Sequence, residues 1–307
     1  MHKVTICTVL FGVDESVLNI ELGNGFLLKK MSLIPSKDHL NEIFSTDAMA
    51  LRREYEEARV DNELNVICVY KYYSIDLDMT ELEEYHTKVC METLEYLDNK
   101  IRIIRLYSEG AIRFKRLSVI INSDKLYMGE TEVKCKQESI IPISEAMGTR
   151  EISKIYVKDN ELEYLNNGLK AMVLPFNDIV INNTHRYYDL SYHVEKNVSL
   201  SLLITCLELL FLNSENAKKE RASKRCTVFL YKNQEERVIC YNKLKVLYKK
   251  RCDFVHDGDD SKIQDNDILI LRDYIRKCII KYWENRYAKI DVIKKLQDEI
   301  RRLDYWE

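Results

Sequence analysis

The stretch EERVICYNKLKVLYKKRCDFVHDG, residues 235–258, decides how the second half of this chain is interpreted. Its apolar side chains recur at spacings of three and four, at Val238, Tyr241, Leu244, Tyr248, Cys252 and Val255. That periodicity is typical of an amphipathic helix with one buried face. Gly258 follows where a helix commonly ends in a left-handed residue. We therefore predict a helix over 235–257.

The residues around this stretch have the same character. From residue 152 to the end the chain contains one Pro and two Gly, so little in it interrupts a helix. The apolar spacing predicts further helices near 160–172, 176–190, 192–213, 216–231, 265–288 and 291–304. We therefore expect residues 151–307 to form an all-helical bundle domain.

The first half mixes two periodicities and predicts a mixed α/β domain over residues 1–150. Residues rich in Val, Ile and Thr predict strands over 2–11, within 17–28, and over 64–76 and 111–121. Helices are expected over 38–60 and from Thr80 to about residue 107, where Thr80 and Glu83 have the spacing of a capping box and Gly110 ends the helix. The expected fold class of the whole chain is α+β.

Composition limits the classes of function. The 307 residues are enough for two domains. The net charge of −3 argues against a large non-specific surface for nucleic acid, but not against a local basic site. The nine cysteines contain no CxxC pair, which favours reduced thiols in a cytoplasmic protein over zinc ligands or a disulfide framework. No signal peptide is apparent, and the longest apolar stretch, 200–212, is too short and too polar to span a bilayer. We expect no cofactor, metal or membrane.

One pair of residues suggests a chemistry. Arg251 and His256 are separated by four residues at the predicted end of the helix. Cleavage of RNA by its own 2′-hydroxyl needs a base for that proton and a cation for the developing phosphate charge, and His and Arg supply these without a metal. The spacing alone has low specificity, since a similar pair occurs roughly once by chance in such a chain, and Arg186 with His193 is one. The alternative is that His256 only stabilises the helix C-terminus.

Residues 200–258 resemble the Apea-like branch of the HEPN superfamily. The resemblance lies in a helix ending CLELLFL (206–212), a polar break at 213–216, a helix with Arg221 and Lys224-Arg225, and the ending LYxxRCxxVH (247–256) close to Gly258. It is looser over 100–199, and we claim none for 1–99. Two positions depart from the family pattern: Cys252 replaces a small polar residue, and Asp257 intervenes before the glycine.

This resemblance implies an endoribonuclease of the toxin or antiviral-defence type, associated with abortive infection, in which two Arg–His motifs face one cleft of a homodimer. It makes Arg251 and His256 the catalytic candidates, supported by Glu208, Asp253 and Cys252. The candidate RNA-binding residues are Lys249, Lys250, Arg221 and Arg225. The alternatives are a solvated charged face for these basic residues, a packing role for Cys252, and a boundary position for Glu208.

Other functions remain open. The same helices can form a non-catalytic dimerisation or ligand-binding module. A third possibility is a toxin that a partner antitoxin silences by modifying a tyrosine two residues after the His. That mechanism has no acceptor here, because the residue at this position is Gly258. The N-terminal region would sense a viral trigger or bind a regulatory partner. The residues that we expect at the dimer contact are Tyr274, Cys278, Ile279 and Tyr282. The alternative is that they only complete the core of the monomer.

Overall fold

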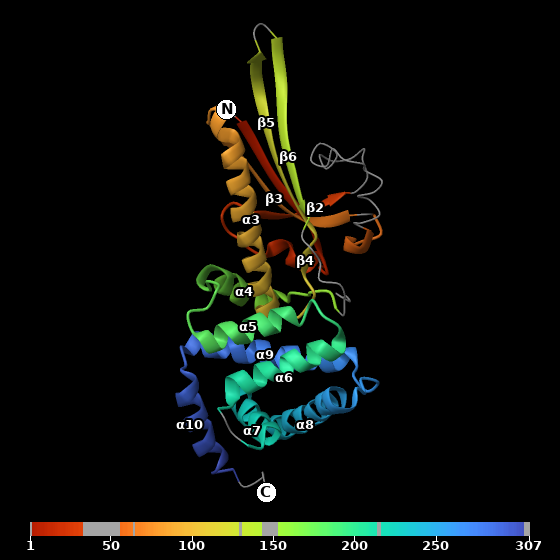
Figure 1. Cartoon of the computed structure of the whole chain (residues 1–307), viewed down its shortest axis with the longest axis vertical. Coiled ribbons are helices and arrows are strands. Elements are labelled where there is room, and N and C mark those ends of the chain that lie inside the picture. Colours follow the sequence, from red (N-terminus) through yellow and green to blue (C-terminus); the bar gives the residue numbers. More distant parts are fainter. Residues whose placement is uncertain are drawn as a thin grey trace. The chain divides into compact units, whose positions relative to one another are not determined.

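The computed structural model describes residues 2–32, 56–63, 65–128, 131–142, 153–213 and 216–303. The chain divides into two compact units: unit 1 comprises Met1–Glu145 and Ser153–Met172, and unit 2 comprises Ala146–Ile152 and Val173–Glu307. An antiparallel sheet with a long helix forms most of unit 1, and helices form unit 2 (Figure 1). The predicted α+β class with a C-terminal helical domain is therefore confirmed.

The sheet of unit 1 is built around its first strand. Its strands are β1 (His2–Phe11), β2 (Leu27–Ser32), β3 (Asn65–Ile75), β4 (Arg113–Phe114), β5 (Arg116–Met128) and β6 (Thr131–Pro142). They pair in the order β2-β3-β1-β5-β6, and β4 pairs with β1. All these pairings are antiparallel, so that Val4 lies opposite Tyr73 on one side and Ile121 on the other. In Figure 1, β5 and β6 extend as a long hairpin.

Both faces of this sheet are covered, which explains the run of buried residues along β1. One face carries a buried cluster that includes Cys7, Val9 and Phe11. The other face packs against α3 (Met79–Tyr107), where Leu97 and Ile101 meet apolar side chains of the strands. The sheet face against α3 also lines a cavity of unit 1.

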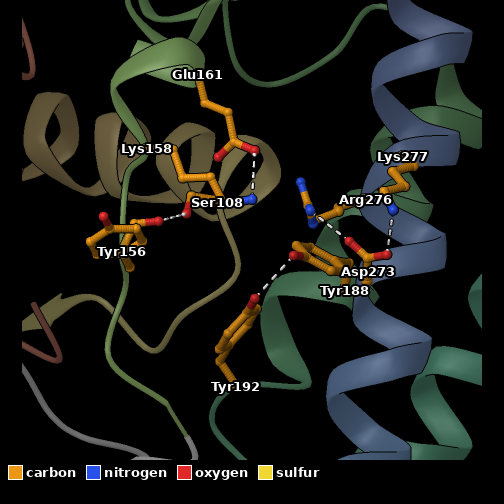
Figure 2. A network of polar contacts seen from close by, with 9 residues as sticks. All are labelled: Ser108, Tyr156, Lys158, Glu161, Tyr188, Tyr192, Asp273, Arg276 and Lys277. Atoms are coloured by element: carbon orange, nitrogen blue, oxygen red, sulfur yellow. Dashed lines mark hydrogen bonds and ion pairs between the residues drawn. The ribbon is translucent and has the colours of Figure 1, made fainter. Parts of the chain in front are cut away.

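Helix α4 (Asp159–Ala171) belongs to unit 1, although the predicted boundary near residue 150 assigned it to the second domain. Gly168 lets α4 pack closely against the end of α3, because a Cβ at this position would come within 2.2 Å of the Tyr107 ring. The Ser108 hydroxyl also donates to the Tyr156 carbonyl at 3.0 Å, just before α4 (Figure 2).

Unit 2 contains α5 (Ile179–Leu190), α6 (Lys196–Phe211), α7 (Lys218–Leu230), α8 (Gln234–Asp257), α9 (Asp265–Asn285) and α10 (Lys289–Ile300). Helix α6 packs against all five others, and its buried residues include Leu200, Leu203, Leu207 and Leu210. The seven helices predicted between residues 160 and 304 are confirmed, with ends that differ by a few residues.

Polar contacts also hold the helices of unit 2. The Arg272 guanidinium donates to the Ser191 carbonyl at 2.6 Å and lies 3.8 Å from the centre of the Tyr192 ring, which ties α9 to the end of α5. Figure 2 shows the Tyr192 hydroxyl beside that of Tyr188, and Asp273 between Arg276 and Lys277 on α9.

Three predictions for unit 1 need correction or fall outside the description. Residues 17–28 are mostly not strand, because a 3-10 helix occupies Glu15–Asn19 and β2 begins only at Leu27. Helix α3 is capped by Asp78 without a side-chain hydrogen bond, so Thr80 forms no capping box. The helix expected over 38–60 lies outside the described residues except for 56–60, where Glu56–Ala58 forms a 3-10 turn.

Candidate active site around Arg251 and His256

Both ends of helix α8 are set by local interactions. At the start, the Asn233 side chain accepts hydrogen bonds from the amides of Glu235 and Glu236, at 2.8 and 3.5 Å. At the end, Gly258 adopts φ +72°, a left-handed conformation that glycine takes without steric cost. Arg251 and His256 therefore lie in the last two turns of one helix, as predicted.

Arg251 lies on the side of α8 that faces the core. It follows the buried residues Leu244, Leu247 and Tyr248 at helical spacing and is itself half-buried. Its Nε atom is enclosed and has no hydrogen-bond partner among the described residues. The guanidinium is thus partly removed from water without a protein acceptor at that nitrogen.

Tyr248, one turn before Arg251, is a second unsatisfied donor. Its side chain is buried, and its hydroxyl also has no hydrogen-bond partner in the described part of the chain. Burial raises the pKa of this hydroxyl well above its usual range, and the nearby charge of Glu208 raises it further, whereas Arg251 acts in the opposite direction. The phenol therefore stays protonated at neutral pH and retains a hydrogen to donate.

Glu208 reaches this place from helix α6. It is half-buried, and its charge is close enough to affect the pKa of Tyr248. No described residue forms an ion pair with Glu208, so Glu208 does not support Arg251 through a direct salt bridge within 4 Å. Glu208, Tyr248 and Arg251 together form a polar group at the junction of α6 and α8, which we call the α6–α8 polar group.

His256 is exposed on the last turn of α8. It lies five positions after Arg251, and at 100° per residue the two side chains leave the helix about 140° apart. Arg251 points toward the core side, so the helix does not present both residues on one wall. The position also suits a helix-capping role, since a protonated imidazole is favoured at a helix C-terminus.

Asp253 and Cys252 lie between Arg251 and His256 on helix α8. Asp253 is half-buried, and Lys262 lies 3.8 Å from its carboxylate. Cys252 is half-buried, in contrast to the buried cysteines Cys7, Cys68, Cys90, Cys206, Cys226, Cys240 and Cys278. Neither residue is in hydrogen-bond contact with Arg251 or His256 in the described structure.

The two lysines before the motif differ. Lys249 is exposed. Lys250 instead donates to the buried Asp267 carboxylate at 2.5 Å, and Lys243 donates to the same group at 3.2 Å. Lys250 therefore fastens α8 to the start of α9, and its role as an RNA contact is not supported by this position.

The two arginines of α7 also differ. Arg221 is exposed, whereas Arg225 is 2 % exposed and donates to the Phe211 carbonyl at 2.7 Å. Arg225 thereby satisfies a carbonyl at the end of α6. It is withdrawn as an RNA contact, because its guanidinium is enclosed in the bundle.

The apolar side chains named for a dimer contact are needed inside unit 2. Cys278, Ile279 and Tyr282 are at most 1 % exposed, and the Tyr282 hydroxyl donates to the Leu210 carbonyl at 2.9 Å. Tyr274 is half-buried against Tyr231. These residues complete the core of a single chain and provide no dimer surface.

The described residues offer no group of three His, Cys, Asp or Glu side chains that could hold a metal ion. In the same residues, no helix combines the length and the apolar character needed to cross a membrane. No protein-family model, curated protein or solved structure matches this chain.

The sequence did not identify two residues that shape this site. The sequence placed Tyr248 in the apolar stripe and in the ending of residues 247–256, without a role for its hydroxyl, although a tyrosine on a core-facing position brings a hydroxyl that needs a partner. Asp267 was expected only as one of the first residues of the helix over 265–288. Its signal was the spacing to Gln264, because the two form a reciprocal capping box at the start of α9.

Proposed function

We propose that this protein is a metal-independent endoribonuclease of the toxin or antiviral-defence type. The observation that supports it best is the α6–α8 polar group at the end of the helix that carries His256. Its Arg251 Nε–H and Tyr248 O–H are two enclosed donors that find no acceptor among the described residues. Unsatisfied buried donors are rare in proteins, and a phosphate oxygen is an acceptor that both groups could use.

In the proposed reaction, His256 removes the proton of a ribose 2′-hydroxyl. The 2′-oxygen then attacks the adjacent phosphorus, and the bond from phosphorus to the 5′-oxygen breaks. A protonated group returns the proton to the 5′-oxygen, so the products are a 2′,3′-cyclic phosphate and a 5′-hydroxyl. Arg251 binds the non-bridging phosphate oxygens and stabilises the charge that develops on them.

The separation of Arg251 and His256 around α8 favours a homodimer for this reaction. One copy supplies the arginine and the other the histidine when two α8 ends meet across a two-fold axis, because each patch then serves both subunits. Lys249 is exposed near that end and is available for a second phosphate. The dimer contact itself must involve residues other than the buried ones of α9.

The decisive experiment incubates pure protein with total RNA in excess EDTA. We expect cleavage that leaves cyclic phosphate ends, and a loss of roughly 10²-fold or more in both His256→Ala and Arg251→Ala. Arg186→Ala is the matched control, because Arg186 is an exposed arginine of the same unit and belongs to the other Arg–His pair in the sequence. Unchanged cleavage in both test variants would refute the assignment.

The second candidate is a non-catalytic dimerisation or ligand-binding module. The half-buried, core-facing position of Arg251 favours it, because such an arginine can serve packing alone. In that case the protein cleaves no RNA, Arg251→Ala lowers stability, and His256→Ala changes little. Light scattering at micromolar concentration then reports whether the helices still form a dimer.

A further inference from the structure

Unit 1 contains a cavity that the proposed nuclease reaction does not use. It has a volume of about 540 Å³ and lies between the face of β1 and β3 and helix α3. The turn at Asn24 and Phe26 closes one side. Cavities that bind small molecules commonly enclose roughly 300–1,000 Å³, so this one has a suitable size. All of its lining residues belong to unit 1.

Aromatic rings make much of the cavity wall. Phe26 and Tyr96 lie nearly parallel, with ring centres 5.5 Å apart and planes inclined by 21°. Tyr73 and Tyr85 complete the wall, and Ile6 provides apolar surface between them. Such flat surfaces bind a planar ring by stacking, and this contact depends little on which ring is presented.

A lysine provides the charge of the cavity. The Lys71 Nζ atom lies 5.0 Å from the centres of both the Phe26 and the Tyr73 rings. No described residue forms an ion pair or hydrogen bond with it. Lys88 and Glu92 at the rim form a pair at 3.8 Å and are each about two-thirds exposed, so they largely cancel. Lys71 therefore leaves the cavity with one unbalanced positive charge.

The tyrosine hydroxyls add a donor beside this charge. Tyr73 and Tyr85 share one hydrogen bond of 3.1 Å between their hydroxyl oxygens, which uses one of the two hydrogens and leaves the other available. Burial raises the pKa of Tyr73, and the bond to Tyr85 raises it further, so the Tyr73 hydroxyl stays protonated at neutral pH. The hydroxyl pair therefore suits a ligand that accepts hydrogen bonds.

These features distinguish between possible ligands. A cationic ligand is disfavoured, because the positive charge of Lys71 beside the Phe26 and Tyr73 rings repels it. An anion without a ring would leave the aromatic walls unused, and a neutral ring would leave Lys71 unpaired. We propose that this cavity binds a small molecule with a planar ring and an anionic group, of the nucleoside-monophosphate type.

Isothermal titration calorimetry on the full chain tests this proposal with four probes. Adenosine monophosphate supplies ring and phosphate, adenosine the ring alone, inorganic phosphate the anion alone, and 1-naphthoate a ring with a carboxylate. We expect adenosine monophosphate to bind with a Kd below about 1 mM, and adenosine and phosphate to bind at least roughly 10-fold more weakly. Binding of naphthoate but not of the nucleotide supports the ring-with-anion chemistry and assigns it to aromatic acids.

Variants place the binding in the cavity. Lys71→Met keeps the aliphatic stem and should weaken binding by roughly 10- to 100-fold, the usual effect of losing one charged contact, whereas Lys71→Arg should retain most of it. Lys29→Met is the matched control, because Lys29 also stacks on a tyrosine of β3, Tyr70, but on the opposite face of the sheet. Circular dichroism verifies that each variant is folded.

Three results would overturn the proposal: no probe binds at up to about 1 mM, adenosine binds as tightly as its monophosphate, or Lys71→Met and Lys29→Met have the same effect. The proposal is independent of the nuclease activity, since it is measured by binding alone. Loss of RNA cleavage in His256→Ala therefore leaves it untouched.

Discussion

The contact between Asp267 and two lysines of α8 should be one of the strongest single polar contributions to unit 2. Asp267 lies in the first turn of α9 and is buried, and its carboxylate accepts hydrogen bonds from Lys250, Lys243 and the Gln264 amide. The change Asp267→Ala removes all three at once. It also releases the end of α8 that precedes Arg251, so the prediction bears on the candidate site.

The expected loss of stability follows from the three contacts. The bond to the Gln264 amide completes a helix cap, and caps contribute about 1 kcal/mol. The 2.5 Å contact to the largely enclosed Lys250 should contribute about 1.5 kcal/mol, as a charged hydrogen bond away from water does. Lys243 is more exposed and adds about 0.5 kcal/mol. We therefore expect Asp267→Ala to lower the free energy of unfolding by about 3 kcal/mol.

Thermal unfolding followed by circular dichroism at the helix signal measures this loss. For a unit of this size, about 3 kcal/mol corresponds to a decrease in Tm of roughly 10 °C. The matched control is Asp265→Ala, because Asp265 lies in the same first turn but is exposed, and only the helix dipole favours it, by less than about 1 kcal/mol. Equal losses in the two variants would refute the assigned role of Asp267.

The dependence on pH gives a second measure of the same contact. Burial alone would raise the pKa of Asp267, but the hydrogen bonds from Lys250, the Gln264 amide and Lys243 hold it below its usual value. A lowered pKa in the folded state means that this stability is fully present above the unfolded pKa of about 3.9 and is lost as the pH falls through the folded pKa. The difference between the native chain and Asp267→Ala should therefore shrink only below about pH 4.

Two further predictions concern other parts of the fold. Gly12→Ala should destabilise unit 1 by at least about 2 kcal/mol, because Gly12 has φ +67° and a Cβ there would lie 2.4 Å from the Ala111 carbonyl oxygen; Gly25→Ala, with φ +76° but no such clash, should cost clearly less in the same denaturant titration. Cys252 should react with iodoacetamide before the other cysteines of unit 2 in the native state, since Cys206, Cys226, Cys240 and Cys278 are buried. Peptide mass spectrometry that finds Cys206 or Cys226 modified equally early would contradict this.

The sequence predicted the helices of unit 2 well because each of them has strong signals. Residues 152–307 contain almost no Gly or Pro, and the few polar breaks fall between the helices. Strand β1 was also predicted with its observed bounds, His2–Phe11. By contrast, residues 17–28 are rich in Val, Ile and Leu because Val17, Ile20 and Leu22 are buried beneath α3, and not because they form a strand. Apolar composition reports burial, and hydrogen bonding decides the secondary structure.

Only the middle of the buried face of α8 was predicted correctly. Leu244 and Tyr248 are buried as expected, but Val238 and Val255 are 37 % and 47 % exposed. The buried face instead includes Arg237, which is 5 % exposed and donates to the Tyr231 carbonyl and to Glu299. A hydrophobic stripe read from the sequence omits such an arginine, because its partners lie elsewhere in the chain.

The same reasoning separates Arg251 from the other enclosed arginines of unit 2. Arg225, Arg237 and Arg272 each donate to a backbone carbonyl, so a partner within the protein explains why each of them is buried. The Nε atom of Arg276 also lacks a partner, but another nitrogen of its guanidinium pairs with Asp273. Arg251 has an enclosed Nε and no hydrogen bond or ion pair with any described residue. A purely structural arginine on this face should have been satisfied as its neighbours are, because leaving a buried donor unpaired costs about 1–3 kcal/mol. A ligand that supplies the acceptor would remove this cost. The Tyr248 hydroxyl, one turn away, is also buried without a hydrogen-bond partner among the described residues. Two such donors side by side favour an acceptor with several oxygens, such as phosphate, over a chance packing defect.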